Sequence, residues 1–424
     1  MVYFKSILVP LFIVAAFFGL YGQGKYTLED AKKKKKNNSP SANIYKVSSM
    51  EKELRNRNAD SKYLPQVNMG GQATYQSEST GLDISFPGVA IPRLSKDQYK
   101  LQADISQSVW DGGLVRAQKA VNETAAAMET AQAEAELEAV TEQVIQTYFG
   151  ILEADANAGI LSLKGKDLQV AKKRLEVGVA NGAVLRADLR RLEAEELTLR
   201  QREAELQSVR RKLIQSLGIL TGRDLETNVQ LPVPSDITPE GEDFGSKPAI
   251  RLFALQEAQL DNARKSEIAL SRPKVQLFGQ AGYGKPGLNF LKNQFDFYWL
   301  GGLRMQWNLG HLYTTKRDAQ LTAIQKEKSG IRKQNYDRQL RLRLAALRSD
   351  IDRLSEVVAT DGEIISLRAE IRKSAAVQYE NGSKAIAEYI DVINDENEAM
   401  IVREVHWLQY LRSVYLYNLT AGSH

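Results

Sequence analysis

The sequence predicts an α+β membrane protein with an internal duplication, in which each half carries a pair of β-strands and a long antiparallel helical hairpin. Three observations lead to this fold class. The segment 177–189 returns in altered form as 377–390, strictly alternating segments occur in two pairs, and no proline interrupts 93–231 or 287–424. A repeat of about 200 residues is far longer than a solenoid repeat, so two copies of one large unit account for the chain.

The duplication sets the predicted boundaries. The offset between the halves is 197 at Asp111 and Asn308 (308 − 111) and 200 at Gly182 and Gly382 (382 − 182). The first repeat is expected at 23–219 and the second at 248–424. Between them, 220–247 is rich in Pro, Gly and Asp and reads as an irregular connector.

The N-terminus reads as a secretory signal peptide, expected at 1–22. Lys5 precedes an apolar run from Ile7 to Leu20, which is too short and too early for a spanning helix. No later segment is apolar for the roughly 20 residues that a helical membrane span needs.

Composition argues against an enzyme. The sequence has no cysteine, a formal charge of only +5, and three histidines that stand alone. We therefore expect no cofactor, no metal site, no catalytic residues and no nucleic-acid partner. A run of glycines that ends at Lys285 matches the spacing of a phosphate-binding loop, but Pro286 follows it and the glycines lie in an alternating strand.

Each half contains a two-faced strand pair, predicted at about 66–109 and 274–308. Apolar and polar residues alternate along all four strands, with aromatic residues towards the strand ends. Soluble sandwiches alternate too, but the signal peptide and the aromatic ends favour a membrane β-barrel with a wet lumen. Because four strands cannot close a barrel, several chains must contribute, and three copies would give twelve strands.

Helical hairpins follow the strand pairs, at about 113–219 and 311–420. Apolar or small residues spaced by three and four mark a seam in each first arm. The seam positions are 137, 140, 144, 148, 151, 154, 158 and 161 in the first repeat, and 340, 344, 347, 351, 354 and 358 in the second.

The hairpin tips are predicted at 177–189 and 377–390. Asn-Gly stands in each tip, at Asn181-Gly182 and Asn381-Gly382, and an acid follows six residues later, at Asp188 or Glu388. Glycine accepts the positive φ that ends a helix, and an acid in the next first turn suits the helix dipole.

Taken in order, these segments resemble the outer membrane efflux protein family, the TolC-like export ducts. The resemblance covers nearly the whole mature chain: an N-P or K-P segment, an L-P-Q-V strand, a strand that ends in W-D-G-G, a long helix and a glycine–acid tip. It implies a homotrimer in the outer membrane of a Gram-negative bacterium. Four β-strands per chain would contribute to a trimeric 12-stranded outer-membrane β-barrel, and the hairpins would form a periplasmic α-barrel.

The resemblance also implies function and site residues. The chain would be the outer-membrane channel of a tripartite efflux or type I secretion system, and its partners would be a periplasmic adaptor, an inner-membrane pump and outer-membrane lipid. A gate would use Asp188, Tyr379 and Lys384, and Glu388 with Asp391 would form an acidic ring at the entrance. Ala187 stands where the family has threonine. The tips that contact the adaptor would comprise Val179, Asn181, Gly182, Asn381, Gly382 and Ser383.

Two other classes of protein contain long helices. A periplasmic adaptor also projects a helical hairpin, but it would have one hairpin flanked by compact β domains. A fibrous surface coiled coil would continue its seams without strands. Detergent-dependent solubility and a heat-modifiable trimer would distinguish the channel from both.

Overall fold

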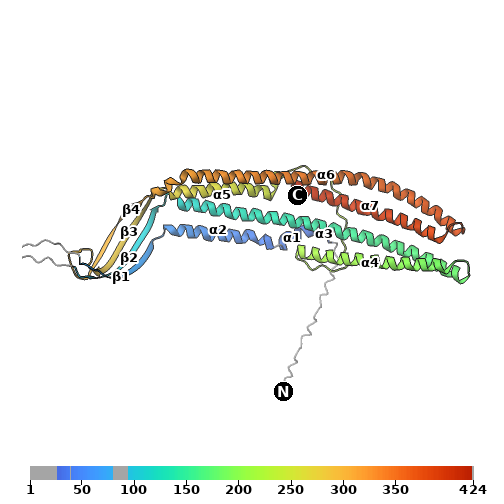
Figure 1. Ribbon diagram of the computed structural model, residues 1–424, viewed down its shortest axis with the longest axis horizontal. Coiled ribbons are helices and arrows are strands. Elements are labelled where there is room, and N and C mark those ends of the chain that lie inside the picture. Colours follow the sequence, from blue (N-terminus) through green and yellow to red (C-terminus); the bar gives the residue numbers. More distant parts are fainter. Residues whose placement is uncertain (1–25, 39, 80–93, 423–424) are drawn as a thin grey trace, which may run out of the picture. The chain divides into compact units, whose positions relative to one another are not determined.

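The computed structural model describes residues 26–38, 40–79 and 94–422, and the predicted signal peptide lies outside these ranges. In chain order the first repeat contains α1 Leu28–Asn38, η1 Pro40–Asn43, α2 Ile44–Asp60, η2 Ser61–Tyr63, β1 Gln66–Tyr75, β2 Asp97–Trp110, α3 Leu114–Ala180 and α4 Arg186–Thr221. After the connector come η3 Phe244–Ser246, α5 Pro248–Leu270, β3 Lys274–Lys285, β4 Asp296–Gln306, η4 Leu309–Tyr313, α6 Thr315–Glu380 and α7 Ile386–Ala421. Figure 1 labels the main elements.

The chain divides into two compact units. The tip unit comprises the described part of Met1–Lys34 with Gln146–Asp236 and Ile365–Val405, and the strand unit comprises the described parts of the remaining segments. None of the described helices is both long enough and apolar enough to cross a membrane.

The strand unit is built on one antiparallel sheet in the order β1-β2-β3-β4. The helices α2, α3, α5 and α6 all meet the same end of this sheet (Figure 1). Helix α5 was missed by the sequence reading. Because Pro248 is the counterpart of Pro40, α5 corresponds to η1 and α2 of the first repeat.

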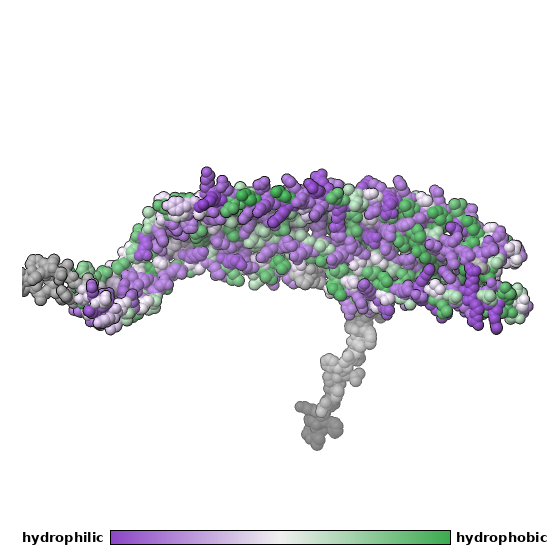
Figure 2. Space-filling model, in the orientation of Figure 1, coloured by the Kyte–Doolittle hydropathy of each residue, from purple (hydrophilic) through white to green (hydrophobic). Residues whose placement is uncertain are grey.

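The helices of the strand unit pack through a narrow apolar seam. Leu340, Leu344 and Ile351 of α6 contact Val414 and Tyr417 of α7 in one buried cluster. Residue 354 of the predicted seam is also buried, as are 144, 148, 151, 154 and 161 of the first repeat. The seams were therefore placed correctly, since their spacing of three and four follows directly from the helical period. Figure 2 shows the helix surfaces as hydrophobic residues interspersed with hydrophilic ones.

The tip unit has its own core. Leu161, Leu168, Ala171 and Leu175 of α3 pack with residues of α4 and α7, which are Leu192, Leu199, Ile386 and Ile390. Three helices therefore share one apolar cluster, so the two hairpins are joined within this unit.

The connector is held to the helices by buried polar bonds in each unit. In the tip unit, the hydroxyl of the fully buried Tyr148 lies 2.7 Å from the Pro232 carbonyl oxygen and 3.1 Å from that of Tyr26. In the strand unit, the buried ammonium of Lys247 binds Glu138 and donates to the Leu419 carbonyl at the end of α7. The predicted irregular connector is thus extended chain that its neighbours fix in place.

Candidate functional site: the sheet and the hairpin tips

The register places most of the apolar residues of the four strands on one face of the sheet. Cross-strand partners form apolar rows, namely Gly71–Leu101–Tyr283–Phe297, Met69–Ala103–Ala281–Trp299 and Val67–Ile105–Gly279–Gly301. No described part of the chain covers this face, since Met69 exposes 79% of its surface and Trp299 exposes 73%. The predicted two-faced strands are therefore confirmed. They include the glycine-rich segment of β3, whose spacing matches that of a phosphate-binding loop.

Aromatic residues mark both ends of the apolar face. At the loop end, Phe295 stacks on Tyr99 and Tyr283 with ring centroids 6.0 and 5.6 Å apart. At the helix end, a β-bulge between Ser108 and Trp110 brings Trp110 opposite Val275, in the apolar row that Met305 completes. A bulge changes the direction of the side chain that follows it. Trp110 therefore lies on the apolar face, whereas strict alternation would place it on the polar face.

The spacing of these aromatic ends fits a membrane. Phe297 and Trp307 are ten residues apart on β4 and just beyond it (307 − 297), or about 33 Å at roughly 3.3 Å per residue. A strand tilt of 35–45° reduces this to about 25 Å, which is the height of the apolar band of an outer-membrane barrel.

The opposite face is polar and hydrogen-bonded. The carboxylate of Asp104 accepts from the side-chain amides of Gln102 at 2.7 Å and Gln280 at 2.6 Å. Near the helix end of the same face, the guanidinium of Arg304 lies 4.4 Å from the ring centroid of Phe278. Charged and amide groups in such a row suit a surface that faces water.

The junction between strand and helix differs in the two repeats. The buried Asp111 accepts the backbone N–H groups of Gly113 at 2.9 Å and Val115 at 2.7 Å, and α3 begins at once. Asn308 accepts only from Gly310, at 3.0 Å, and η4 intervenes before α6.

Both hairpin tips adopt the same helix-ending turn. Gly182 and Gly382 have φ of +68° and +70°, as predicted from the Asn-Gly pairs. In the first tip the N–H of Ala183 bonds to the Gly178 carbonyl at 2.8 Å, and in the second that of Ser383 bonds to the Gln378 carbonyl at 2.9 Å. These bonds define a Schellman cap.

The tip residues predicted to contact a partner are mostly exposed. Asn181, Gly182, Asn381, Gly382 and Ser383 lie on the surface, and Val179 is half-buried. No atom beyond the chain neighbours lies within 4 Å of where a Cβ would stand on either glycine. The glycines are therefore required by the turn, and the space beside them is open.

Two of the three residues predicted for the gate, Lys384 and Tyr379, have other partners within the chain. The Lys384 ammonium, just before α7, lies 3.8 Å from Glu388 in the first turn of that helix, and Asp188 is half-buried in the first turn of α4. The ring of Tyr379 stacks on Tyr389 with centroids 5.2 Å apart, and burial raises the pKa of Tyr379 above its usual value. A contact between Lys384 and Asp188 remains a prediction about neighbouring hairpins.

Two ion pairs that the sequence reading missed join the hairpins. Arg191 of α4 lies 3.8 Å from Asp391 of α7, and Arg174 of α3 lies 3.8 Å from Glu380 of α6. Asp391, predicted for the acidic ring, therefore has a basic neighbour. No local signal reveals these pairs, since each joins residues 200 or more positions apart.

One histidine also has a partner that the sequence did not reveal. His406 of α7 lies 2.7 Å from the carboxylate of Asp361 on α6, through its Nδ1. The expectation that it stands alone was wrong, because the residues are 45 positions apart along the chain. Among the described residues, no group of three or more metal-ligating side chains occurs.

Comparison with known proteins shows the fold. No family model matches the sequence, and no curated protein matches it either. Solved structures do match. The outer-membrane channel OprN has a TM-score of 0.71 at 14% identity, covering 94% of this chain and 90% of that one. The open state of the Neisseria gonorrhoeae MtrE outer membrane channel has a TM-score of 0.70 at 14% identity, covering 93% and 89%.

A further match is the Campylobacter jejuni CmeC outer membrane channel, with a TM-score of 0.69 at 15% identity, covering 93% of this chain and 85% of that one. The predicted TolC-like fold, with a four-stranded sheet and long helical hairpins, is therefore confirmed.

Proposed function

We propose that this chain, which has the fold of outer-membrane efflux channels, is the outer-membrane channel of a tripartite efflux or type I secretion system in a Gram-negative bacterium. Three copies would close a twelve-stranded barrel in the outer membrane and extend a helical barrel into the periplasm. The channel would passively conduct substrates delivered by a periplasmic adaptor and an inner-membrane pump, and we assign it no enzymatic step.

The main support for this proposal comes from the sheet. It has one exposed apolar face, one polar face and two edge strands, β1 and β4, that pair with no further strand among the described residues. In hydrocarbon, unpaired backbone groups cost several kcal/mol each, so the edges must pair. Because the four strands alternate in direction, β4 of one copy meets β1 of the next antiparallel, and an even-stranded barrel closes.

Exposed apolar residues on the helices support the same assembly. Val47, Met50 and Leu54 form an exposed stripe on α2, and Leu321, Ile324 and Ile331 form another on α6. Helix α2 precedes β1 and α6 follows β4, so both stripes belong to the elements at the two edges. Contact between α6 of one copy and α2 of the next would bury both stripes.

The tips are proposed as the periplasmic entrance and the adaptor contact. Val179, Asn181 and Gly182 of the first tip, with Asn381, Gly382 and Ser383 of the second, would meet the adaptor. Asp188, Tyr379 and Lys384 would form the gate, and Glu388 with Asp391 the acidic ring. Exposed glycines with open space beside them support close approach by another backbone.

Planar-bilayer recording tests this proposal. The protein extracted from membranes should migrate as a heat-modifiable trimer and conduct as a cation-selective pore, since charged rings set selectivity. Glu388→Gln/Asp391→Asn should weaken that selectivity, whereas Glu205→Gln, at an exposed carboxylate of α4, should leave it unchanged. A protein that is monomeric and soluble without detergent would instead indicate the periplasmic adaptor class.

A further inference from the structure

The turn η4, between β4 and α6, exposes apolar side chains just beyond the apolar face of the sheet. Leu309 and Leu312 each expose 51% of their surface and Tyr313 exposes 82%. All three stand after Trp307, at the helix end of the strand. Exposed apolar side chains that lie together are unfavourable in water, so we expect these three to contact an apolar partner.

Hydrogen bonds fix η4 in this position. The Asn308 side chain accepts the Gly310 N–H at 3.0 Å, and the Thr315 hydroxyl donates to the His311 carbonyl at 2.9 Å. The indole N–H of Trp307 donates to the carbonyl of Ser271, the C-cap residue of α5, at 2.9 Å, which ties the end of β4 to the end of α5. The exposed side chains therefore project from an ordered turn.

The second repeat has this turn and the first does not. The offset between the repeats is 197 at Asp111 and 200 at Gly182, so the second repeat has three more residues between these points (200 − 197). In the first repeat α3 starts three residues after Asp111, whereas in the second α6 starts seven residues after Asn308. The additional residues fall where η4 lies, so a turn of this kind is not needed to join a strand to a helix.

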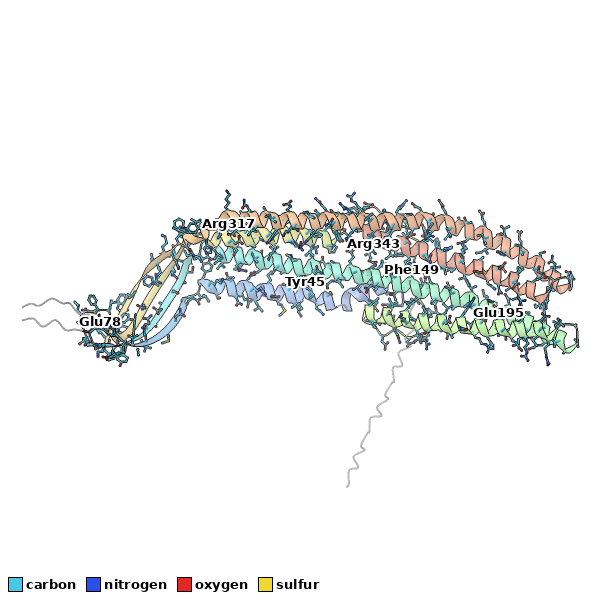
Figure 3. All side chains as sticks on the ribbon, in the orientation of Figure 1. Tyr45, Glu78, Phe149, Glu195, Arg317 and Arg343 are labelled. Atoms are coloured by element: carbon cyan, nitrogen blue, oxygen red, sulfur yellow. The ribbon has the colours of Figure 1, made fainter. Side chains whose placement is uncertain are left out.

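Two exposed cations follow the turn directly. Lys316 and Arg317 lie on the surface in the first turn of α6, and Figure 3 labels Arg317 where α6 begins beside β4. Within the part of the chain that the structure describes, neither has a carboxylate partner. Arg317 also donates to the Tyr313 carbonyl at 3.4 Å, so its charge lies close to the apolar residues.

The order along the chain is that of a bilayer interface. An apolar strand face comes first, then Trp307 and the apolar turn with Tyr313, and then Lys316 and Arg317. Amphipathic aromatic residues favour the headgroup level, and basic side chains beside it attract anionic lipid.

We propose that η4, Lys316 and Arg317 form a binding site for anionic phospholipid, in which the cations bind the headgroup phosphodiester and the apolar side chains enter the adjoining leaflet. This inference rests on the proposed membrane barrel and identifies the lipid class and the residues that bind it. Three such sites per trimer would fix the depth of the barrel at its helix end.

Tryptophan quenching by brominated lipid tests the site. In a Trp299→Phe/Trp407→Phe background, only Trp110 and Trp307 at the helix end of the sheet remain fluorescent. Reconstituted with dibrominated phosphatidylglycerol or dibrominated phosphatidylcholine, this protein should prefer the anionic lipid. Lys316→Gln/Arg317→Gln should reduce that preference by at least about fivefold, which corresponds to roughly 1 kcal/mol, the contribution of one basic residue near an anionic membrane surface.

Two controls separate the possible outcomes. Lys328→Gln/Arg332→Gln removes the same charge from α6 at about 20 Å from the site, and it should leave the preference intact. Glycerol 3-phosphate should not compete, because it lacks acyl chains. Equal quenching by both lipids, equal loss in the control variant, or competition by glycerol 3-phosphate would overturn the lipid site. An absence of quenching by either lipid would overturn the membrane barrel itself.

Discussion

Asp111 shows how one side chain determines where the strand pair ends and the helix begins. Burial alone would raise its pKa, but hydrogen bonds from the N–H groups of Val115 and Gly113 and from the Tyr63 hydroxyl outweigh burial, and the pKa lies below its usual range. The pKa of its partner Tyr63 changes in the matching direction, since burial and the hydrogen bond to Asp111 raise it. The fold therefore favours the ionised carboxylate.

Substitution of Asp111 should destabilise the folded chain in a pH-dependent way. Asp111→Ala removes both N-terminal bonds of α3 and should cost about 1–2 kcal/mol, and Asp111→Asn should cost less because one acceptor remains. A lowered folded-state pKa stabilises above the unfolded pKa of about 3.9, and this stabilisation is lost as pH falls through the folded value. Thermal unfolding at pH 7 and at pH 3 should show the difference between native and variant shrinking in acid. A constant difference would exclude ionisation as its source.

Substitutions at Gly182 and Gly382 can distinguish a role as helix caps from a role in contacting the adaptor. Gly→Val at both tips should disrupt the turns, since a β-branched residue at positive φ is strongly disfavoured. Gly→Asn at both should keep the turns, because asparagine tolerates this conformation, while adding a side chain where the structure leaves space.

Export assays on stable trimers distinguish the two roles. If close approach by the adaptor needs bare glycine, the asparagine variant should form trimers and fail to export. Full export by the asparagine variant would mean that both glycines serve only as helix caps.

Among contacts between elements, the Tyr148 hydroxyl links three segments, since it joins α3 to the connector and to the chain before α1. Tyr148→Phe leaves two buried carbonyl oxygens without this donor and should destabilise the tip unit by about 1–3 kcal/mol. Tyr45→Phe, at an exposed tyrosine of α2 (Figure 3), is the matched control and should have no effect in thermal unfolding. Equal losses in both variants would mean that the Tyr148 hydroxyl has no special role.

The ion pairs between the hairpins are also features of elements. Arg191–Asp391 and Arg174–Glu380 are both exposed, so each contributes only about 0.2–1 kcal/mol, and salt screens them. Arg191→Asp should raise the conductance of the closed channel at low salt, and Arg191→Asp/Asp391→Arg should restore it. Single-channel recording at low and high salt checks this. Failure of the double variant to restore closure would return the gate to Lys384 and Asp188.

The sequence predicted elements better than contacts between them. Strand faces and helix seams follow from local periods of two and 3.6 residues, so the alternation of β3 and the seam at Leu340 and Leu344 were visible in one segment. The bulge before Trp110, the partner of His406 and the pair Arg191–Asp391 depend on elements far apart in the chain. No local pattern encodes those distances. The extra length in the η4 region appeared only as a change of three residues in the offset between the repeats.

At the scale of the whole molecule, the proposed barrel depends on how the edges of neighbouring chains pair. The strand unit ends in two different edges, β1 and β4, and a contact between unlike edges is heterologous, so it closes a ring when the rotation permits. Pairing of like edges would stop at a dimer and leave the other two edges bare. The apolar face and the unlike edges together therefore favour the proposed closed ring of copies.

Disulfide trapping between the edges tests this claim most directly, and a sequence with no cysteine makes it unambiguous. Cysteines would be placed at one of several polar-face positions of β1, at Asn68, Gly70 or Gln72, together with Leu300 on the same face of β4. At the matching register, oxidation in the membrane should convert the protein to a covalent trimer, while chains with the β1 cysteine alone or the β4 cysteine alone stay uncrosslinked. Crosslinking that stops at dimers, or that occurs with β1 cysteines alone, would contradict the twelve-stranded barrel.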